Sequence, residues 1–456
     1  MLVENDPGGR SAEVVVPPPH GGGRRFESDR PPPSPAAIAA CVATLEALRG
    51  VDPADPAFVA VERAAAHLAK EAKKKRRHAR KTVARAEDRA ALASTGRVAA
   101  YVGGAAIEAR AIADAPVAAA RPLRHQRRCY VCKQPYRVVH GFYHLLCTTC
   151  AERNLAARAD TIDLTGRRAI VTGGRVKIGH VAALGLLRAG ARVTITTRFP
   201  RDAERRFADH AERLTIVGLD FLDLRAVLGW IDGELARGEP LDILINNAAQ
   251  TVRRPRAYHA ALAAGERGEL PPPTDDVTAL LFPDRLDPDG QPLDLRPRNS
   301  WVLPAADVEP VELVEVHLVN AMVPFLLASR LRPLFVRSRH RDRYIVNVSA
   351  MEGVFAYGNK QPRHPHTNMA KAALNMFTRT SAQDYVTDGI YMNSVDTGWI
   401  TQENPAPQRA RAEAAGFCPP LDVVDGAARV LAPILRGVRG EPIAGAFFKD
   451  FEPAPW

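Results

Sequence analysis

Four cysteines whose spacing suits a metal ion form the most specific short signal in this 456-residue chain. Cys129, Cys132, Cys147 and Cys150 make two Cys-x-x-Cys pairs separated by fourteen residues. Each pair can hold one side of a tetrahedral ion, and four thiolates leave no open position for water or substrate. We therefore predict a small zinc knuckle over 121–158, in which metal binding contributes folding energy. A redox Cys-x-x-Cys pair is the alternative, but it would need only one motif.

A second group of reactive side chains lies at 366–375, HTNMAKAALN, where Lys371 sits on an apolar helical pattern. The group also includes His366, whose ordinary pKa of about 6.5 suits proton transfer near neutral pH. Thr367 follows it, and an aliphatic hydroxyl is a far weaker acid than a phenol. The segment therefore offers an amine and an imidazole, but no phenol.

The sequence pattern changes near Thr161, where the elements that must position these residues begin. Short apolar runs then alternate with amphipathic helices, and the runs are RRAIVTGG, ARVTITTR, LTIVGLD, LDILINNAA, RYIVNVSA and YMNSVDTG. Apolar strands separated by helices predict an α/β fold, a doubly wound Rossmann-type parallel sheet covered on both faces. Ligands bind such sheets beyond the carboxyl ends of the strands, where the first strand enters a glycine-rich turn.

That turn is TGGRVKIG, Thr172 to Gly179, and from here the sequence resembles the short-chain dehydrogenase/reductase family over 161–456. Thr172, Gly173 and Gly179 match the family pattern TGxxxGxG, and Lys177 replaces its middle glycine. The amides of the turn and of the helix that it opens would hold a pyrophosphate. The resemblance implies cofactor contacts at Gly173, Arg175, Lys177, Ile178 and Gly179.

The resemblance also indicates which dinucleotide is bound. The second strand ends in TITTRFP, with Arg198 where an acid would take a ribose hydroxyl pair. A guanidinium suits a 2′-phosphate, so we expect NADP(H) in preference to NAD(H). A plain surface arginine is the alternative. Further cofactor contacts are implied at Asp220, Phe221, Asn246, Asn247, Lys371, Gly398 and Thr401.

The family's reacting groups are only partly present. Lys371 occupies the lysine position, and Asn320 matches the asparagine that anchors a proton-relay water. Thr367 stands where the family has its tyrosine. The family's serine falls on Ala350, with Ser349 one residue earlier, and Ser349 could replace it only if the strand end bulges.

Two other side chains could supply the missing proton. His366 lies beside Thr367, and Tyr357 lies in a loop four residues longer than the family norm, which could bring its phenol back over the nicotinamide. The alternatives are that His366 is only a helix-start residue and that Tyr357 is a packed loop aromatic.

The remaining segments have distinct compositions. Residues 1–35 are rich in proline and glycine and predict a disordered tail. Residues 36–120 predict basic helices, one from Ala36 to about Arg49 and one from Pro56 to about Ser94. The dinucleotide-binding domain follows over 159–456, with an unusual insertion at about 250–308 that we expect to face substrate or a partner.

Charge and hydropathy limit the classes of partner. The chain carries 62 Lys and Arg against 51 Asp and Glu, a formal charge of +11. Nine basic residues fall between Lys70 and Arg85, but without aromatic residues for stacking, so a nucleic-acid role competes with a solvated helix. We expect no signal peptide, no membrane span and a cytoplasmic location.

Two functions follow from these patterns. The first is an NADP(H)-dependent oxidoreductase that acts on a small-molecule carbonyl or alcohol with an altered proton donor, in a homo-oligomer expected by resemblance. The second is a catalytically degenerate dinucleotide-binding sensor or scaffold, which engages a protein or nucleic acid through the knuckle and the basic helix.

Overall fold

The computed structural model describes residues 32–102, 119–270, 275–287, 291–356, 358 and 360–456. They belong to two compact units, with the boundary between Lys81 and Thr82. Most of the predicted tail over 1–35 and part of the predicted 36–120 region lie outside the described residues.

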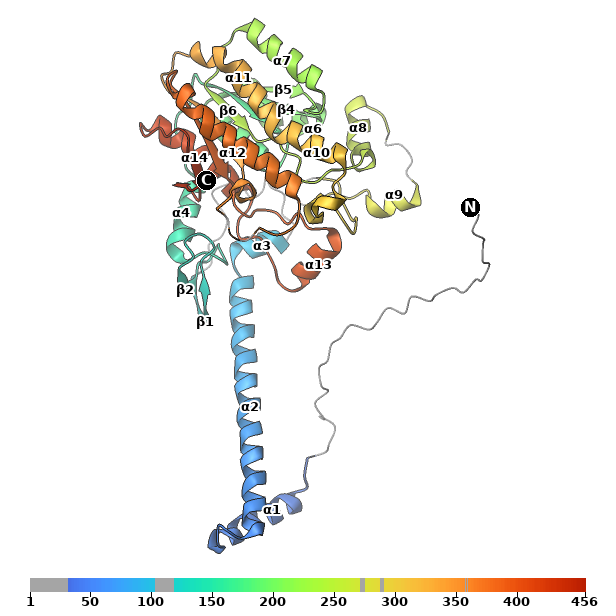
Figure 1. Ribbon diagram of the computed structural model, residues 1–456, viewed down its shortest axis with the longest axis vertical. Coiled ribbons are helices and arrows are strands. Elements are labelled where there is room, and N and C mark those ends of the chain that lie inside the picture. The colour runs from blue at the N-terminus through green and yellow to red at the C-terminus, as the bar shows by residue number, and fades with distance from the viewer. Residues whose placement is uncertain (1–31, 103–118, 271–274, 288–290, 357, 359) are drawn as a thin grey trace, which may run out of the picture. The chain divides into compact units, whose positions relative to one another are not determined.

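The first unit is helical where it is described. Helix α1 spans Pro35–Ala47, begins at the Ser34 cap and buries none of its side chains. Helix α2 spans Pro56–Ala93, carries the basic run, and contains the boundary between the two units. Both helices confirm the sequence prediction to within two residues at each end. The long α2 is drawn in blue in Figure 1.

The second unit is built on an eight-stranded sheet in the order β10-β9-β8-β7-β6-β3-β4-β5. All neighbours are parallel except β10 and β9, and the six predicted strands pair in regular register. The sheet confirms the predicted doubly wound fold. The strands are β3 (Arg168–Thr172), β4 (Arg192–Thr197), β5 (Leu214–Gly218), β6 (Ile243–Asn246), β7 (Arg343–Ser349), β8 (Ile390–Asp396), β9 (Phe447–Lys449) and β10 (Glu452–Ala454).

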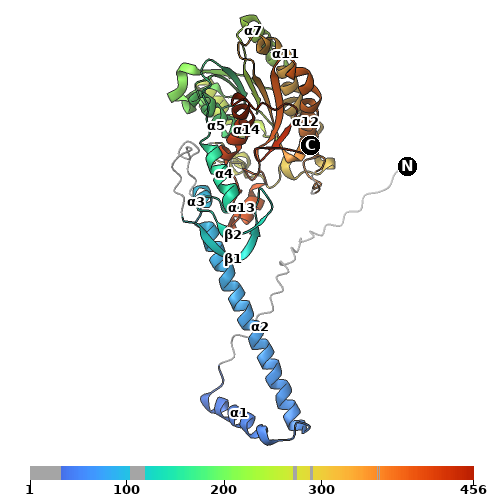
Figure 2. The same ribbon diagram turned by 90° about the vertical axis from the view of Figure 1, so that its left-hand side faces the viewer.

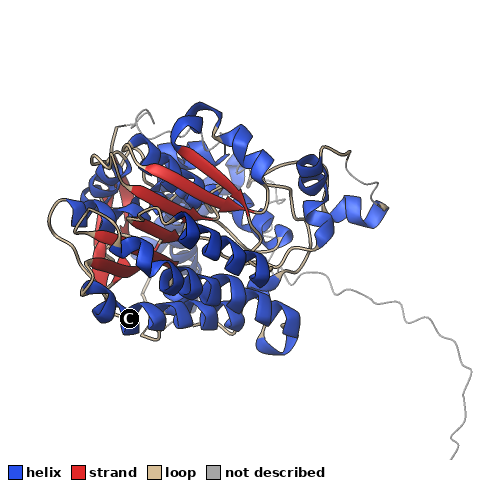
Figure 3. Cartoon of the chain, turned by 90° about the horizontal axis from the view of Figure 1, so that it is seen from above, coloured by secondary structure: helices blue, strands red, loops and turns tan. Residues whose placement is uncertain are grey.

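Helices cover both faces of this sheet, as Figure 3 shows. One face buries apolar side chains of α5 (Lys177–Arg188) and α14 (Val423–Val438), and the other buries those of α7 (Leu224–Arg237), α11 (Val323–Val336) and α12 (Pro365–Val386). Strands β3, β6 and β7 are buried along nearly all of their length because helices cover both faces, whereas the edge strand β5 is only partly buried. The remaining helices are α3 (Gly96–Val102), α4 (Thr148–Arg158), α6 (Pro200–Arg206), α8 (Ala260–Arg267), α9 (Asp276–Leu281), α10 (Pro310–His317) and α13 (Ala406–Ala414).

The cysteine segment forms a small hairpin followed by α4. Strands β1 (Arg121–Arg128) and β2 (Pro135–Val139) pair antiparallel with a register shift. The segment lies beside α14 in Figure 2, and Tyr143 and Leu146 are buried in the core that α14 shares with the sheet. The knuckle is therefore packed into the second unit.

Residues Pro310–Val336 form one helix that is long and apolar enough to cross a membrane by length and composition, with a mean hydropathy of 1.6. Val323, Leu327 and Phe335 are fully buried against the sheet. These apolar residues thus serve the core, whereas others on the same helix, such as Val314 and Met322, are exposed. A single turn of π-helix, Leu318–Met322, interrupts it at Asn320.

Candidate functional site

A cavity of about 2360 Å³ opens at the carboxyl ends of the parallel strands. Its walls come from the turns that follow β3, β4, β5, β6, β7 and β8, which is the position where doubly wound sheets bind ligands. The lining segments include 175–179, 196–200, 218–224, 247–256, 348–352 and 396–404.

The two matched glycines allow the glycine-rich turn to pack closely against the chain that follows β6. Gly173 has φ +65, and a Cβ there would lie 2.9 Å from the Cα of Ala248. A Cβ at Gly179 would lie 2.3 Å from Nδ2 of Asn247. The close approach of strand and helix at this turn therefore requires glycine at both positions.

Lys177 adopts a backbone conformation that glycine adopts more readily than other residues. Its φ is +54, in the left-handed region that is uncommon for residues other than glycine. Its side chain lines the cavity, and its Nζ lies 3.7 Å from Oε1 of Glu403. The lysine thus keeps the shape of the turn and adds a cation to the cavity, beside Ile178, which also lines it.

The two predicted arginine contacts have different surroundings. Arg175 is buried, pairs with Asp202 at 2.6 Å and lies over the ring of Phe199. Its pKa is lowered by burial, although the carboxylate of Asp202 opposes that effect. Arg198 is exposed, lines the cavity, and has its Nη2 3.3 Å from Nε2 of His259. Arg198 is therefore the more accessible of the two for a phosphate.

The remaining predicted cofactor residues are also placed by the sheet. Asn247 lines the cavity and donates from Nδ2 to the carbonyl oxygen of Thr172 at 2.9 Å, whereas Asn246 is buried and donates to Asn347. The hydroxyl of Thr401 donates to Glu403 at 2.7 Å. Asp220, Phe221, Gly398 and Thr401 all line the cavity, but Asn246 is not among the lining residues.

Lys371 lies at the end of the cavity near β7. Its Nζ donates a hydrogen bond to the carbonyl oxygen of Val348 at 2.7 Å. Burial lowers the pKa of Lys371 to about 8, and the carboxylate of Glu352 acts in the opposite direction. Asn320 lies at the π-helical turn, where Oδ1 accepts from the amide of Gln250 at 2.7 Å and Nδ2 donates to the carbonyl of the same residue at 3.1 Å. Asn320 thus holds the chain that follows β6.

Both predicted hydroxyls reach the cavity. Ser349 and Thr367 are buried and line it, and neither side-chain oxygen has a hydrogen-bond partner among the described residues. Strand β7 keeps regular register through the Ser349–Asp396 pair, so the bulge on which we conditioned a role for Ser349 is absent from this pair of strands. Ala350 lines the cavity too, because the chain leaves the strand at that residue.

Of the two side chains considered as substitute proton donors, His366 and Tyr357, the structure describes only the first. His366 is 1% exposed, and its Nε2 lies 3.3 Å from Oε1 of Glu312 on α10. It is not among the cavity-lining residues, because its position at the start of α12 turns the ring toward α10. Tyr357 lies outside the described residues.

Glu352 is a titratable cavity residue that sequence reasoning missed. It lies in the short 3-10 turn Met351–Gly353 directly after β7. A Cβ at Gly353 would lie 2.6 Å from the carbonyl carbon of Lys371, so this turn is pressed against α12. Burial raises the pKa of the Glu352 carboxyl, and the charges of Lys360 and Lys371 only partly offset it. The sequence did contain a signal for this residue, because NVSAMEG places a glutamate shortly after the strand that ends at Ser349.

The cysteine quartet is brought together as its spacing predicts. The four sulfur atoms of Cys129, Cys132, Cys147 and Cys150 lie within 4.8 Å of one another, which is close enough to hold one metal ion. Tyr130, inside the first pair, lines the cavity. Sequence reasoning missed that contact because the two sites are far apart in the chain.

The insertion covers part of the cavity. Arg254, Tyr258, His259 and Gln291 come from it and line the wall near the glycine-rich turn. Gln291 accepts a hydrogen bond from Arg175 at 2.9 Å. The insertion is therefore placed beside the turn that follows β3.

Comparison with known families gives two matches. Residues 167–262 match the family described as short chain dehydrogenase, and residues 300–416 match the one described as Enoyl-(Acyl carrier protein) reductase. The unmatched stretch between them falls within the insertion. The matched residues include the glycine-rich turn in the first case and Lys371 in the second.

Two curated proteins show the extent of the likeness. An uncharacterized protein of Acanthamoeba polyphaga mimivirus is 32% identical over 346 residues, which cover 68% of this chain and 71% of that protein. The rhamnolipids biosynthesis 3-oxoacyl-[acyl-carrier-protein] reductase of Pseudomonas aeruginosa is 28% identical over 247 residues, covering 52% of this chain and 73% of that one.

Solved structures resemble the fold at lower identity. The Pseudomonas aeruginosa RhlG/NADP active-site complex is 22% identical, with a TM-score of 0.43 over 63% of this chain and 95% of that one. The NADPH-bound carbonyl reductase from chicken fatty liver is 19% identical, with a TM-score of 0.43 over 64% of this chain and 100% of that one.

Proposed function

The chain belongs to the short-chain dehydrogenase/reductase family, and from that premise we propose that it is an NADP(H)-dependent oxidoreductase acting on a carbonyl or alcohol. The observation that carries the proposal is the position of Lys371. Its buried amine lies on the β7 side of the glycine-rich turn that follows β3, and the opposite end of the cavity is formed by the turns after β4 and β5, which include Arg198. A dinucleotide extended between the two ends would bring its nicotinamide ribose to Lys371.

The residues present fit such a cofactor. A Cβ at Gly173 or Gly179 would collide with its surroundings, so the turn is shaped for a close backbone approach. The amides at the start of α5 and the Lys177 side chain favour a pyrophosphate. Arg198 supports the choice of NADP(H), because a guanidinium forms paired hydrogen bonds with phosphate oxygens.

When bound, NADPH would supply the hydride, and the protein must supply a proton to the carbonyl oxygen. Thr367 cannot replace a phenol in that step, since an aliphatic hydroxyl is too weak an acid. We propose that the Glu352 carboxyl supplies it. Glu352 lines the cavity in a turn that is pressed against the Lys371 segment, and burial raises the pKa of its carboxyl, so it retains a proton to higher pH than an ordinary glutamate. Ser349 and Thr367 would then orient the substrate oxygen.

The proposal is tested by calorimetric titration of the purified chain with NADPH and NADH, followed by turnover with aldehydes, ketones and 3-oxoacyl thioesters. We expect binding that favours NADPH, and consumption of NADPH with at least one carbonyl class. Absence of binding by either dinucleotide would overturn the proposal.

A second function is favoured by one observation, the threonine at the tyrosine position. NADPH binding without turnover in any of these assays would support a dinucleotide-binding sensor or scaffold. The partner of such a protein would then be sought through the knuckle and the basic residues of α2, first by testing whether short RNA or DNA duplexes bind with the salt dependence expected of phosphate contacts.

A further inference from the structure

Tyr130 connects the cysteine quartet to the end of the cavity near Lys371. It lies between Cys129 and Cys132, and its phenol oxygen accepts a hydrogen bond from the main-chain N–H of Trp399 at 2.8 Å. A Cβ at Gly398 would lie 3.5 Å from the same oxygen. The phenol is therefore in contact with the turn that follows β8.

The turn that carries Tyr130 is closed by its own hydrogen bonds. The amide of Cys129 donates to the carbonyl of Gln134 at 2.9 Å, and that of Lys133 donates to the carbonyl of Cys129 at 3.1 Å. The amide of Tyr130 donates to the carbonyl of Leu145 at 2.8 Å, which joins the turn to the second cysteine pair. A metal ion on the four sulfurs would fix the same turn from the other side.

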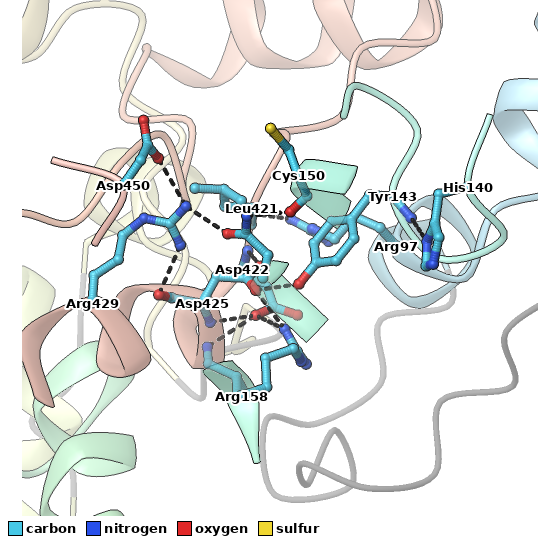
Figure 4. Close-up of polar contacts among 12 residues, drawn as sticks. Arg97, His140, Tyr143, Cys150, Arg158, Leu421, Asp422, Asp425, Arg429 and Asp450 are labelled. Carbon is cyan, nitrogen blue, oxygen red and sulfur yellow. Dashed lines mark hydrogen bonds and ion pairs between the residues drawn. The ribbon is translucent and has the colours of Figure 1, made fainter. Parts of the chain in front are cut away.

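The knuckle is also held on the dinucleotide-binding domain by a buried polar network, shown in Figure 4. Arg158 of α4 lies 2.7 Å from Asp422 and 3.1 Å from Asp425, and Tyr143 donates to Asp425. Asp422 also caps the start of α14. Because these charges are paired and fully enclosed, separating the knuckle from α14 would leave buried charges without partners.

A second arm of the network joins α4 to the last strands. Arg429 of α14 donates to Asn154 of α4 at 2.7 Å and to Asp450 at 2.9 Å. The start of α14 also contacts the β8 turn, because the amide of Leu421, next to Asp422, donates to the carbonyl oxygen of Trp399 at 3.3 Å. The hydrogen bond between Tyr130 and Trp399 therefore joins two segments that are each held in place by other contacts.

We infer that Tyr130 is a positioning residue through which the cysteine knuckle sets the Gly398–Thr401 turn, and so the site of the nicotinamide half of the cofactor. The inference rests on the proposed function, since it assigns this turn to the nicotinamide end of the cavity. The metal site would then serve ligand binding as well as folding, because it holds the turn from which the phenol reaches Trp399.

The contacts of the Tyr130 phenol are with the backbone of the turn after β8. The phenol oxygen lies against both Gly398 and Trp399. It accepts the Trp399 hydrogen bond. These contacts suit an anchor for the turn.

The test compares Tyr130→Phe with Tyr136→Phe. Both variants lose a phenol oxygen from the knuckle, but the Tyr136 hydroxyl donates to the carbonyl of His144 and does not line the cavity. For each variant, calorimetry measures the affinity for NADPH and for adenosine 2′,5′-bisphosphate, which lacks the nicotinamide half. Zinc content and melting temperature are measured alongside.

Loss of the Trp399 acceptor is expected to weaken NADPH binding roughly three- to tenfold in Tyr130→Phe, the equivalent of one hydrogen bond. Binding of the bisphosphate and the zinc content should match the wild type, and Tyr136→Phe should bind both ligands normally. Unchanged NADPH binding in Tyr130→Phe, or an equal loss for both ligands, would overturn the inference. If the wild-type chain binds the bisphosphate but not NADPH, the proposed function fails instead, and the inference with it.

Discussion

The amine of Lys371 on α12 donates to the carbonyl oxygen of Val348 on β7 at 2.7 Å, which joins the helix to the strand at the end of the cavity. The amine is buried, so this hydrogen bond satisfies a group that would otherwise be costly to enclose. The same bond places Lys371 beside Ser349, Thr367 and the turn that contains Glu352.

NADPH affinity is expected to fall as the pH rises through about 8. Burial lowers the pKa of Lys371 to about 8, so the amine is charged below that pH and neutral above it, and the charged amine donates the stronger hydrogen bonds to the hydroxyls of the nicotinamide ribose. Calorimetry between about pH 6 and about pH 10 measures the change. Lys371→Met should bind weakly without this decline, whereas Lys70→Met, an exposed change on α2, should behave as the wild type. A wild-type affinity that is flat over the range would contradict the assignment.

Arg198→Ala should weaken NADPH roughly ten- to a hundredfold, the effect of losing charged hydrogen bonds to one phosphate. NADH should be affected by no more than about twofold, because it lacks the 2′-phosphate. Arg192→Ala is the matched control, since Arg192 is an exposed arginine at the opposite end of the strand that Arg198 follows. Titration of both variants with both dinucleotides checks the result. Equal losses for NADPH and NADH would place the phosphate elsewhere.

Most of the sheet could be predicted from the sequence because strands β3 to β8 are short, mainly apolar runs. The predicted runs correspond to β3, β4, β5, β6, β7 and β8, and local burial on both faces determines their composition. The glycine-rich turn could be read as well, since Gly173 and Gly179 satisfy steric demands made by close neighbours.

Contacts between segments that are far apart in the chain could not be predicted from local sequence patterns. The bond between Tyr130 and Trp399 spans 269 positions, and nothing near either residue signals the other. His366 shows the opposite error, because its proximity to Thr367 in sequence suggested a shared site. On a helix, adjacent residues face different directions, so Thr367 lines the cavity while His366 meets Glu312.

The cysteine quartet is expected to bind about one zinc ion per chain. Cys129→Ser should reduce the bound zinc and lower the melting temperature, because metal binding contributes folding energy and the knuckle packs into the core through Tyr143. Cys41→Ser provides the control, since Cys41 is exposed on α1 and outside the quartet. Elemental analysis and thermal unfolding supply the measurements. A chain that is free of metal and equally stable in both variants would refute the zinc site.

Glu352→Gln should lower turnover with a carbonyl substrate about a hundredfold or more while leaving NADPH affinity nearly unchanged, because a general acid acts on the chemical step. The acid form is the active one, and burial raises the pKa of Glu352, so wild-type turnover should fall as the pH rises above that raised pKa. This decline should be absent from the residual activity of Glu352→Gln. Glu309→Gln, an exposed change before α10, should retain the wild-type profile. If Glu352→Gln turned over substrate at the wild-type rate with the same pH profile, the proton would have to come from another group, and Tyr357→Phe would be the next variant to measure.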